Sequence, residues 1–186
     1  MAGTVTAAQT VGPFFSIGLK HLYVDDLAPL APLHQKISMH GRVVDGDGKP
    51  VNDALLEIWQ ADAQGIYAHP DDVRNNEATP GFRGFGRIAT VENGEFRFTT
   101  IKPGRVAGPD GALQAPHLLV AVFMRGLLRH LVTRLYFPDD AANASDPILE
   151  RVPEARRATL IATKSATALE WNVILQGSNE TVFFDY

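Results

Sequence analysis

Hydrophobic residues alternate with polar or small residues in short runs along most of the chain. This alternation directs every second side chain to the same face and is typical of half-buried β-strands. It predicts strands at residues 37–43, 55–59, 84–90, 95–99, 118–124 and 131–137, and a final hairpin formed by 169–175 and 181–184. Turn sequences separate several of these runs, such as Asp-Gly-Asp-Gly at 45–48 and Asn-Gly at 93–94.

Two segments lack this alternation. Residues 1–35 show no sustained period, so we predict an irregular N-terminal arm. The adjacent phenylalanines at 14–15 favour an arm that contacts a partner subunit, because a solvated tail rarely carries so much apolar surface. A short helix is predicted at 154–162, directly after Pro153. The fold class is therefore all-β: an antiparallel β-sandwich at 36–186 with an extended arm and one short helix.

Composition narrows the possible function classes. The chain has 186 residues, 45% of them hydrophobic, which suits one domain with a real core. No apolar run is long enough for a membrane span, and strands do not alternate with helices as in a Rossmann fold. The net charge is -4 with scattered basic residues, so nucleic acid is not an expected partner. The chain has no cysteine and begins without a signal-peptide pattern, and we expect a cytoplasmic protein.

The residues alone define no catalytic site. None of the six histidines has the spacing of a metal motif, and an isolated histidine is more often structural than a ligand. The acidic pairs at 71–72 and 139–140 occur in turn-like segments, where carboxylates usually cap the backbone. Trp59 and Trp171 lie within strand patterns and are predicted to be core residues.

Five sequence blocks carry a family resemblance. They are Q-T-V-G-P-F-F at 9–15, L-E-I-W-Q-A-D at 56–62 with G-I-Y at 65–67, T-I-K-P-G at 100–104, A-P-H at 115–117, and R-L-Y-F-P at 134–138. In this order they resemble the intradiol ring-cleavage dioxygenases over nearly the whole chain. The resemblance implies a β-sandwich, in agreement with the strand pattern.

The resemblance also implies a metal site that is degenerate here. Catalytic members hold ferric iron with two tyrosines and two histidines, and phenolate oxygens are hard donors that suit Fe3+. The matching positions in this chain are Tyr67, Val106, His117 and Leu119, and Gln114 replaces a catalytic arginine. Valine and leucine offer no lone pair. We therefore expect neither a metal nor a catalytic residue in this chain, with Tyr67 and His117 kept as hydrogen-bonded relics.

The resemblance offers an explanation for the two missing ligands. Some family members are hetero-oligomers in which the beta subunit carries the Fe3+ and the other subunit binds no metal. The resemblance then implies that four residues line a substrate pocket shared with that beta subunit: Thr10, Gly12, Pro13 and Arg125. A guanidinium suits a planar carboxylate, and a Gly-Pro turn lets backbone groups approach a small aromatic substrate. Without the resemblance, Gly12–Pro13 would be interpreted as an ordinary turn and Arg125 as a surface charge.

Two other functions remain open at this stage. One is a self-sufficient intradiol dioxygenase acting on catechol or hydroxyquinol, against which Val106 and Leu119 argue. The other is a β-sandwich binding module without a catalytic partner. The retained arm segment at 10–15 and the expected cytoplasmic location argue against this module.

Overall fold

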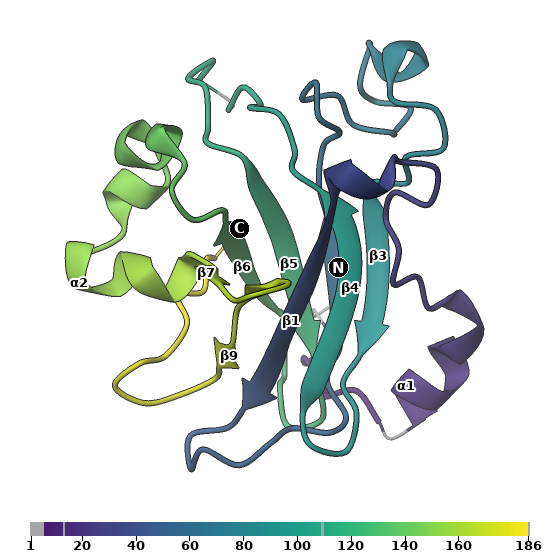
Figure 1. Cartoon of the computed structure of the whole chain (residues 1–186). Helices are drawn as coiled ribbons and strands as arrows, with labels where there is room; N and C mark the ends of the chain where they lie inside the picture. The colour runs from purple at the N-terminus through teal and green to yellow at the C-terminus, as the bar shows by residue number, and fades with distance from the viewer. Residues whose placement is uncertain (1–5, 13, 109, 186) are drawn as a thin grey trace, which may run out of the picture.

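The computed structural model describes residues 6–12, 14–108 and 110–185. These residues form two β-sheets that pack face to face (Figure 1). One sheet contains β1 (Lys36–Val44), β4 (Glu95–Ile101), β7 (Thr163–Lys164), β8 (Leu169–Glu170) and β9 (Val173–Ile174). The other contains β2 (Leu55–Trp59), β3 (Phe85–Ala89), β5 (His117–Phe123) and β6 (Leu131–Tyr136). The predicted β-sandwich is confirmed.

The long strands pair in antiparallel fashion. The first sheet has the order β4–β1–β8–β7, with β9 also along β1, and the second has the order β3–β2–β5–β6. The β1–β4 pairing runs from Lys36 opposite Ile101 to Arg42 opposite Glu95. The predicted turn at 93–94 forms before β4, and Gly94 has a φ of 75° there, a conformation that glycine adopts without strain. This turn does not close a hairpin, because β3 pairs with β2 and β4 pairs with β1 in the other sheet.

The C-terminal segment differs from the predicted hairpin. Strands β8 and β9 run parallel to β1, and the N–H of Trp171 donates to the carbonyl of His40 over 2.9 Å. Phe184 instead bridges to Val132 in β6. The segment thus satisfies backbone groups along one edge of β1 that would otherwise stay unpaired.

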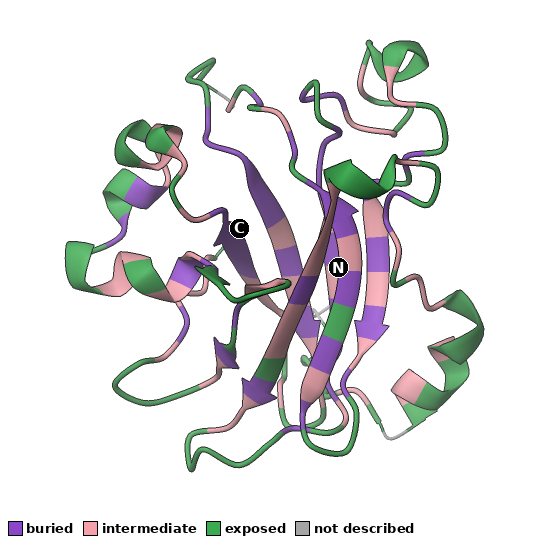
Figure 2. Cartoon of the chain, viewed as in Figure 1, coloured by how far each residue is buried: buried purple, intermediate pink, exposed green. Residues whose placement is uncertain are grey.

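The helices are short. The predicted helix at 154–162 forms as α2 (Glu154–Arg157), followed by the 3-10 turn η6 (Ala158–Leu160). A further helix, α1 (Phe14–Leu19), lies within the arm that we predicted to be irregular. It has no buried residue (Figure 2). It is only six residues long, which is too short for a helical period to show in the sequence. The remaining 3-10 turns are η1 (Lys20–Leu22), η2 (Leu33–Gln35), η3 (Asn75–Glu77), η4 (Ala141–Ser145) and η5 (Leu149–Arg151).

Part of the expected arm belongs to the sandwich itself. Val24 bridges to Arg87 of β3, and Asp26 bridges to Thr99 of β4. Leu27 between them is fully buried in the main core. The chain therefore joins the sandwich well before residue 36, and residues 24–27 link the edges of the two sheets.

The main core lies between the sheets, where Figure 2 shows buried positions alternating along the strands. Trp171 is buried there, as predicted. Trp59 is only partly buried and stacks on Tyr67, so its predicted core role is wrong. In the part of the chain that the structure describes, no helix is long and apolar enough to cross a membrane.

Candidate functional site

Strands β5 and β6 give the second sheet two chemically different faces. Leu118, Val120 and Leu135 lie in the core between the sheets. Because side chains alternate along a strand, His117 and Leu119 lie on the opposite face. We call this the outer face.

Cross-strand pairing surrounds these positions with aromatic and charged residues. His117 lies opposite Tyr136, and their rings are 5.7 Å apart. Leu119 lies opposite Arg134 on β6 and opposite Trp59 on β2. The outer face therefore brings two of the four positions of the degenerate metal site next to an arginine.

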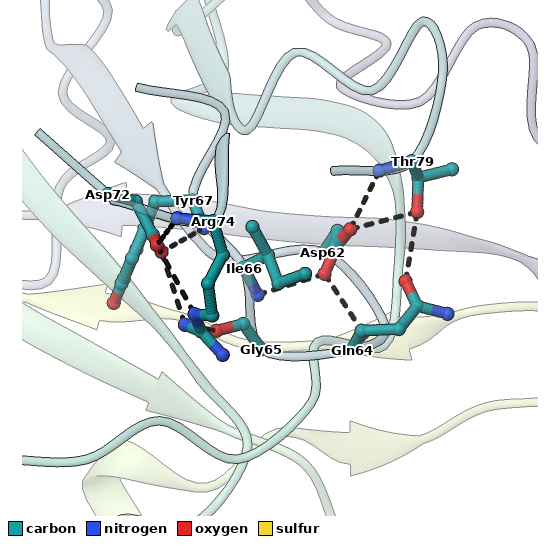
Figure 3. Close-up of polar contacts among 8 residues, drawn as sticks. All are labelled: Asp62, Gln64, Gly65, Ile66, Tyr67, Asp72, Arg74 and Thr79. Atoms are coloured by element: carbon teal, nitrogen blue, oxygen red, sulfur yellow. Dashed lines mark hydrogen bonds and ion pairs between the residues drawn. The ribbon is translucent and has the colours of Figure 1, made fainter. Parts of the chain in front are cut away.

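Tyr67 approaches the outer face from a loop that Asp62 organises (Figure 3). The fully buried Asp62 carboxylate accepts hydrogen bonds from the N–H groups of Gln64 and Ile66, each over 2.9 Å. Its other oxygen accepts from the N–H of Thr79 over 2.8 Å and from its hydroxyl over 2.9 Å. One carboxylate thus fixes both ends of a loop of about fifteen residues, because a buried anion needs this many donors.

A second carboxylate fixes the Tyr67 backbone. Asp72 accepts from the N–H of Tyr67 over 3.0 Å and from the N–H of Arg74 over 2.9 Å (Figure 3). These backbone hydrogen bonds lower the pKa of Asp72 to about 2. The Tyr67 ring stacks on Trp59 with ring centres 5.8 Å apart. The ring therefore has one defined position above the outer face.

The glycine of the G-I-Y triplet allows two loops to meet. Gly65 has a φ of 77°, and a Cβ there would lie 2.3 Å from the carbonyl oxygen of Arg105. Only glycine permits this approach. As a result Tyr67 and Val106 line the same open cavity of about 500 Å³, together with Trp59.

His117 is a buried neutral base. Its Nδ1 lies 2.8 Å from the carbonyl oxygen of Ala115, which can only accept, so Nδ1 carries the proton. Burial lowers the pKa of His117 to about 4, and the positive charge of Arg134 acts in the same direction. The expected hydrogen bond of this residue is therefore present.

Arg134 is the centre of a buried polar cluster. It is 7% exposed, donates to the amide oxygen of Gln114, and also hydrogen-bonds the Tyr136 hydroxyl. That hydroxyl donates over 3.0 Å to Asp146, which is fully buried. Asp146 also accepts from the N–H of Ala115 over 2.7 Å. We call these residues the Arg134 cluster, and it balances a buried cation with a buried anion.

The residues of the degenerate site do not fit ferric iron. Val106 and Leu119 supply no donor, so only two of the four positions could contribute a ligand to Fe3+. The Arg134 charge acts on both Tyr67 and His117, so a permanent cation already lies close to the two remaining donors. Across 6–12, 14–108 and 110–185, no three His, Cys, Asp or Glu residues are grouped as metal ligands would be.

The other predicted site residues gather at the opposite end of the sandwich, where the arm meets the turn between β5 and β6 (Figure 1). The N–H of Gly126 donates to the Thr10 hydroxyl over 2.8 Å. The carbonyl of Gly12 accepts from the N–H of Phe15, whose ring packs 5.6 Å from Phe123. Pro13 lies outside the described residues. We call this region the arm–hairpin junction.

Arg125 is exposed at this junction. Its side chain is 57% exposed, and its Nε donates to the Asp53 carboxylate, which lies just before β2. Strand β5 alone separates Arg125 from His117 by about 20 Å. The structure thus brings Thr10 next to Arg125, but it keeps both far from the degenerate metal site.

Sequence reasoning missed Asp53, Arg134 and Asp146. The alternation of side chains along residues 131–137 could have placed Arg134 on the outer face. Its neighbours Thr133 and Leu135 point to the opposite face, toward the core between the sheets. No local pattern marks Asp53 as the partner of Arg125, because 72 positions separate them.

The β-sandwich agrees with comparisons to known proteins. A sequence model of the family described as Dioxygenase matches residues 22–177. The chain belongs to the intradiol dioxygenase family, which confirms the family expected from the five sequence blocks.

Three relatives illustrate this membership. The chain is 43% identical to the protocatechuate 3,4-dioxygenase alpha chain of Burkholderia cepacia, over 97% of this chain and 96% of that one. It is 40% identical to the beta chain of the same enzyme from Burkholderia cepacia, over 81% of this chain and 68% of that one. A solved dioxygenase domain from Streptomyces sp. SirexAA-E, part of a fusion with a carbohydrate-binding protein, matches with a TM-score of 0.58 and 25% identity, over 82% of this chain and 85% of that one.

Proposed function

We propose that this chain is the alpha, non-metal-binding subunit of a protocatechuate 3,4-dioxygenase. The near full-length match to an alpha chain supports this assignment, and a beta chain is also similar. The proposed complex is cytoplasmic and pairs this chain with a beta subunit that holds Fe3+. Alone, this chain is inactive.

The proposed reaction opens the aromatic ring of protocatechuate between its two hydroxyl-bearing carbons. Both atoms of O2 enter the product, 3-carboxy-cis,cis-muconate, so no further reductant is required. The product feeds the β-ketoadipate pathway of aromatic catabolism. The Fe3+ of the beta subunit would supply a binding site for the two hydroxyl oxygens of the substrate.

The observation that carries the proposal is the loss of metal donors at the four positions of the degenerate site. Two of four donor positions are Val106 and Leu119, and the buried Arg134 lies opposite Leu119. A chain with the family fold but without these two donors fits a subunit that acts through an iron-bearing partner. The role left to this chain is to shape the pocket of the partner.

The proposed pocket residues are Thr10, Gly12, Pro13 and Arg125. Thr10, Gly12 and Arg125 are exposed, as residues that face a partner in the assembly should be. Phe14 and Ile17 in the adjoining helix α1 are 78% and 56% exposed, which leaves apolar surface for the beta subunit to cover. We therefore propose that the arm contacts the beta subunit.

Co-expression with a beta chain tests the proposal. The beta chain should contain both tyrosines and both histidines of the family's iron site, and the affinity tag should be on this chain. We expect the tag to retain the beta chain, one iron per pair, and conversion of protocatechuate. Failure to retain any beta chain, or iron that stays with this chain after the two are separated, would contradict the proposal.

A further inference from the structure

We propose that Asp53 is a positioning residue, which orients the Arg125 guanidinium toward the carboxylate of the substrate. This inference rests on the proposed function, in which Arg125 lines the shared pocket. It assigns to Asp53 a role that is exerted through Arg125 and not on the substrate itself.

The first observation is which guanidinium nitrogen Asp53 binds. The carboxylate accepts from Nε, the nitrogen nearest the side-chain stem. No hydrogen-bond partner of the two terminal nitrogens of Arg125 occurs among the described residues. Asp53 therefore fixes the plane of the group and leaves its outer edge open. Two parallel N–H groups at that edge match the two oxygens of a carboxylate.

The second observation is how firmly the neighbouring backbone is held. The residue after Arg125 donates its N–H to the Thr10 hydroxyl over 2.8 Å. Asp53 is more enclosed than Arg125, with 24% of its side chain exposed against 57%. Asp53 is therefore the more enclosed partner of this ion pair, and its hydrogen bond limits the rotamers open to Arg125. Backbone and side chain of Arg125 are thus both constrained before any substrate binds.

The size of the expected effect follows from exposure. Exposed ion pairs are weak, so the pair does not compete strongly with a substrate carboxylate. Its contribution is preorganisation, because a flexible side chain loses rotamer freedom when it binds. We expect removal of Asp53 to weaken use of the carboxylated substrate by roughly two- to fivefold.

The experiment uses the assembled complex with the beta subunit. Asp53→Ala should raise the KM for protocatechuate by roughly two- to fivefold relative to the KM for catechol, which lacks the carboxylate, with kcat unchanged. Asp53→Asn keeps an acceptor for Nε and should have a smaller effect. In an Arg125→Ala background, Asp53→Ala should change the ratio of the two KM values no further, because there is no guanidinium left to orient.

Asp47→Asn is the matched control. It removes a carboxylate from the same connection between β1 and β2, where Asp47 is 75% exposed and pairs with Lys49. It should leave both KM values unchanged.

The outcomes separate the inference from the proposed function. If Arg125→Ala alters the ratio and Asp53→Ala does not, Asp53 does not position Arg125. If Asp53→Ala lowers the KM for protocatechuate, Asp53 competes with the substrate, and the inference is again overturned. If Arg125→Ala leaves the ratio unchanged, the proposed pocket role of Arg125 fails, and the role of Asp53 with it.

Discussion

Two arginines on one pair of strands have opposite surroundings. Arg134, within β6, is 7% exposed and is bound by Gln114 and Tyr136. Arg125, just beyond β5, has a side chain that is 57% exposed and is held at Nε by Asp53. The difference shows how one side-chain type serves either as an internal structural cation or as a group available to a ligand. The role of each arginine depends on how many of its N–H groups already donate hydrogen bonds within the protein.

The comparison also separates two ends of the sandwich. The end with the Arg134 cluster holds the four positions at which the family resemblance predicts a degenerate metal site, and a buried cation lies beside Tyr67 and His117 there. The end with the arm–hairpin junction presents exposed groups, which a second subunit could cover. In this chain the end that resembles a catalytic site is structural, and the exposed end is the candidate for binding.

The largest effect is expected at the Arg134 cluster. Arg134→Met keeps similar volume but removes the buried cation, which leaves Gln114 without this donor and Asp146 without the nearby compensating charge. We expect the free energy of unfolding to fall by about 3 kcal/mol, measured by urea denaturation. Arg129→Met, at an exposed position of the same hairpin, is the control and should change it by less than about 0.5 kcal/mol. Similar losses in both variants would remove the contrast between buried and exposed arginines.

The second effect concerns acid stability. Burial lowers the pKa of His117 from 6.5 to about 4 in the folded chain, so the unfolded chain binds the proton more readily. Stability should therefore fall as pH decreases from about 6.5 to about 4, by at most about 3 kcal/mol from this residue. His117→Gln should show a shallower decline over that window in unfolding experiments. If the free energy of unfolding of His117→Gln declined with pH as steeply as that of the unsubstituted chain, His117 would not be held neutral beside Arg134.

The third effect tests whether the open edge of Arg125 matters. In the assembled complex, Arg125→Ala should lower kcat/KM for protocatechuate by roughly ten- to a hundredfold, because a charged hydrogen bond contributes about 1.5–3 kcal/mol. Catechol turnover should change much less. Arg125→Lys restores the charge without the planar pair of donors and should recover only part of the preference. If Arg125→Lys fully restored the preference for protocatechuate over catechol, a positive charge at this position would be sufficient and the planar pair of donors would not matter.

The smallest effect is expected from the arm. Removal of residues 1–15 deletes Thr10 and the Phe15–Phe123 contact, which should weaken assembly or raise the KM for protocatechuate by several-fold. Size-exclusion chromatography and steady-state kinetics of the complex measure both. If complex size and KM survive the deletion unchanged, the arm is dispensable.

The sequence predicted the sandwich well because its strands are amphipathic. Strands β1 to β6 begin and end within about two residues of the alternating runs, since alternation follows directly from burial of one face. The positions of β8 and β9 could not be predicted in this way. They are two residues long and are set by the open edge of β1, a contact between distant parts of the chain.

The candidate site was predictable only in part. Tyr67, Val106, His117 and Leu119 could be assigned from the spacing of family motifs, which is a local property. The burial of Arg134 and the pairing of Asp53 with Arg125 depend on strand order and on loops meeting at one end, which spacing does not encode. Pro13 remains a prediction, because it lies outside the described residues.

Iron content of this chain without its partner tests the central claim most directly. The chain is purified free of beta subunit, incubated with iron under air, desalted, and analysed for bound metal and visible absorption. With two donors missing and the Arg134 cation beside the others, we expect a colourless protein with far less than one iron per chain. Near-stoichiometric iron with tyrosinate-to-iron absorption would contradict the claim that this chain's own pocket is closed to the metal.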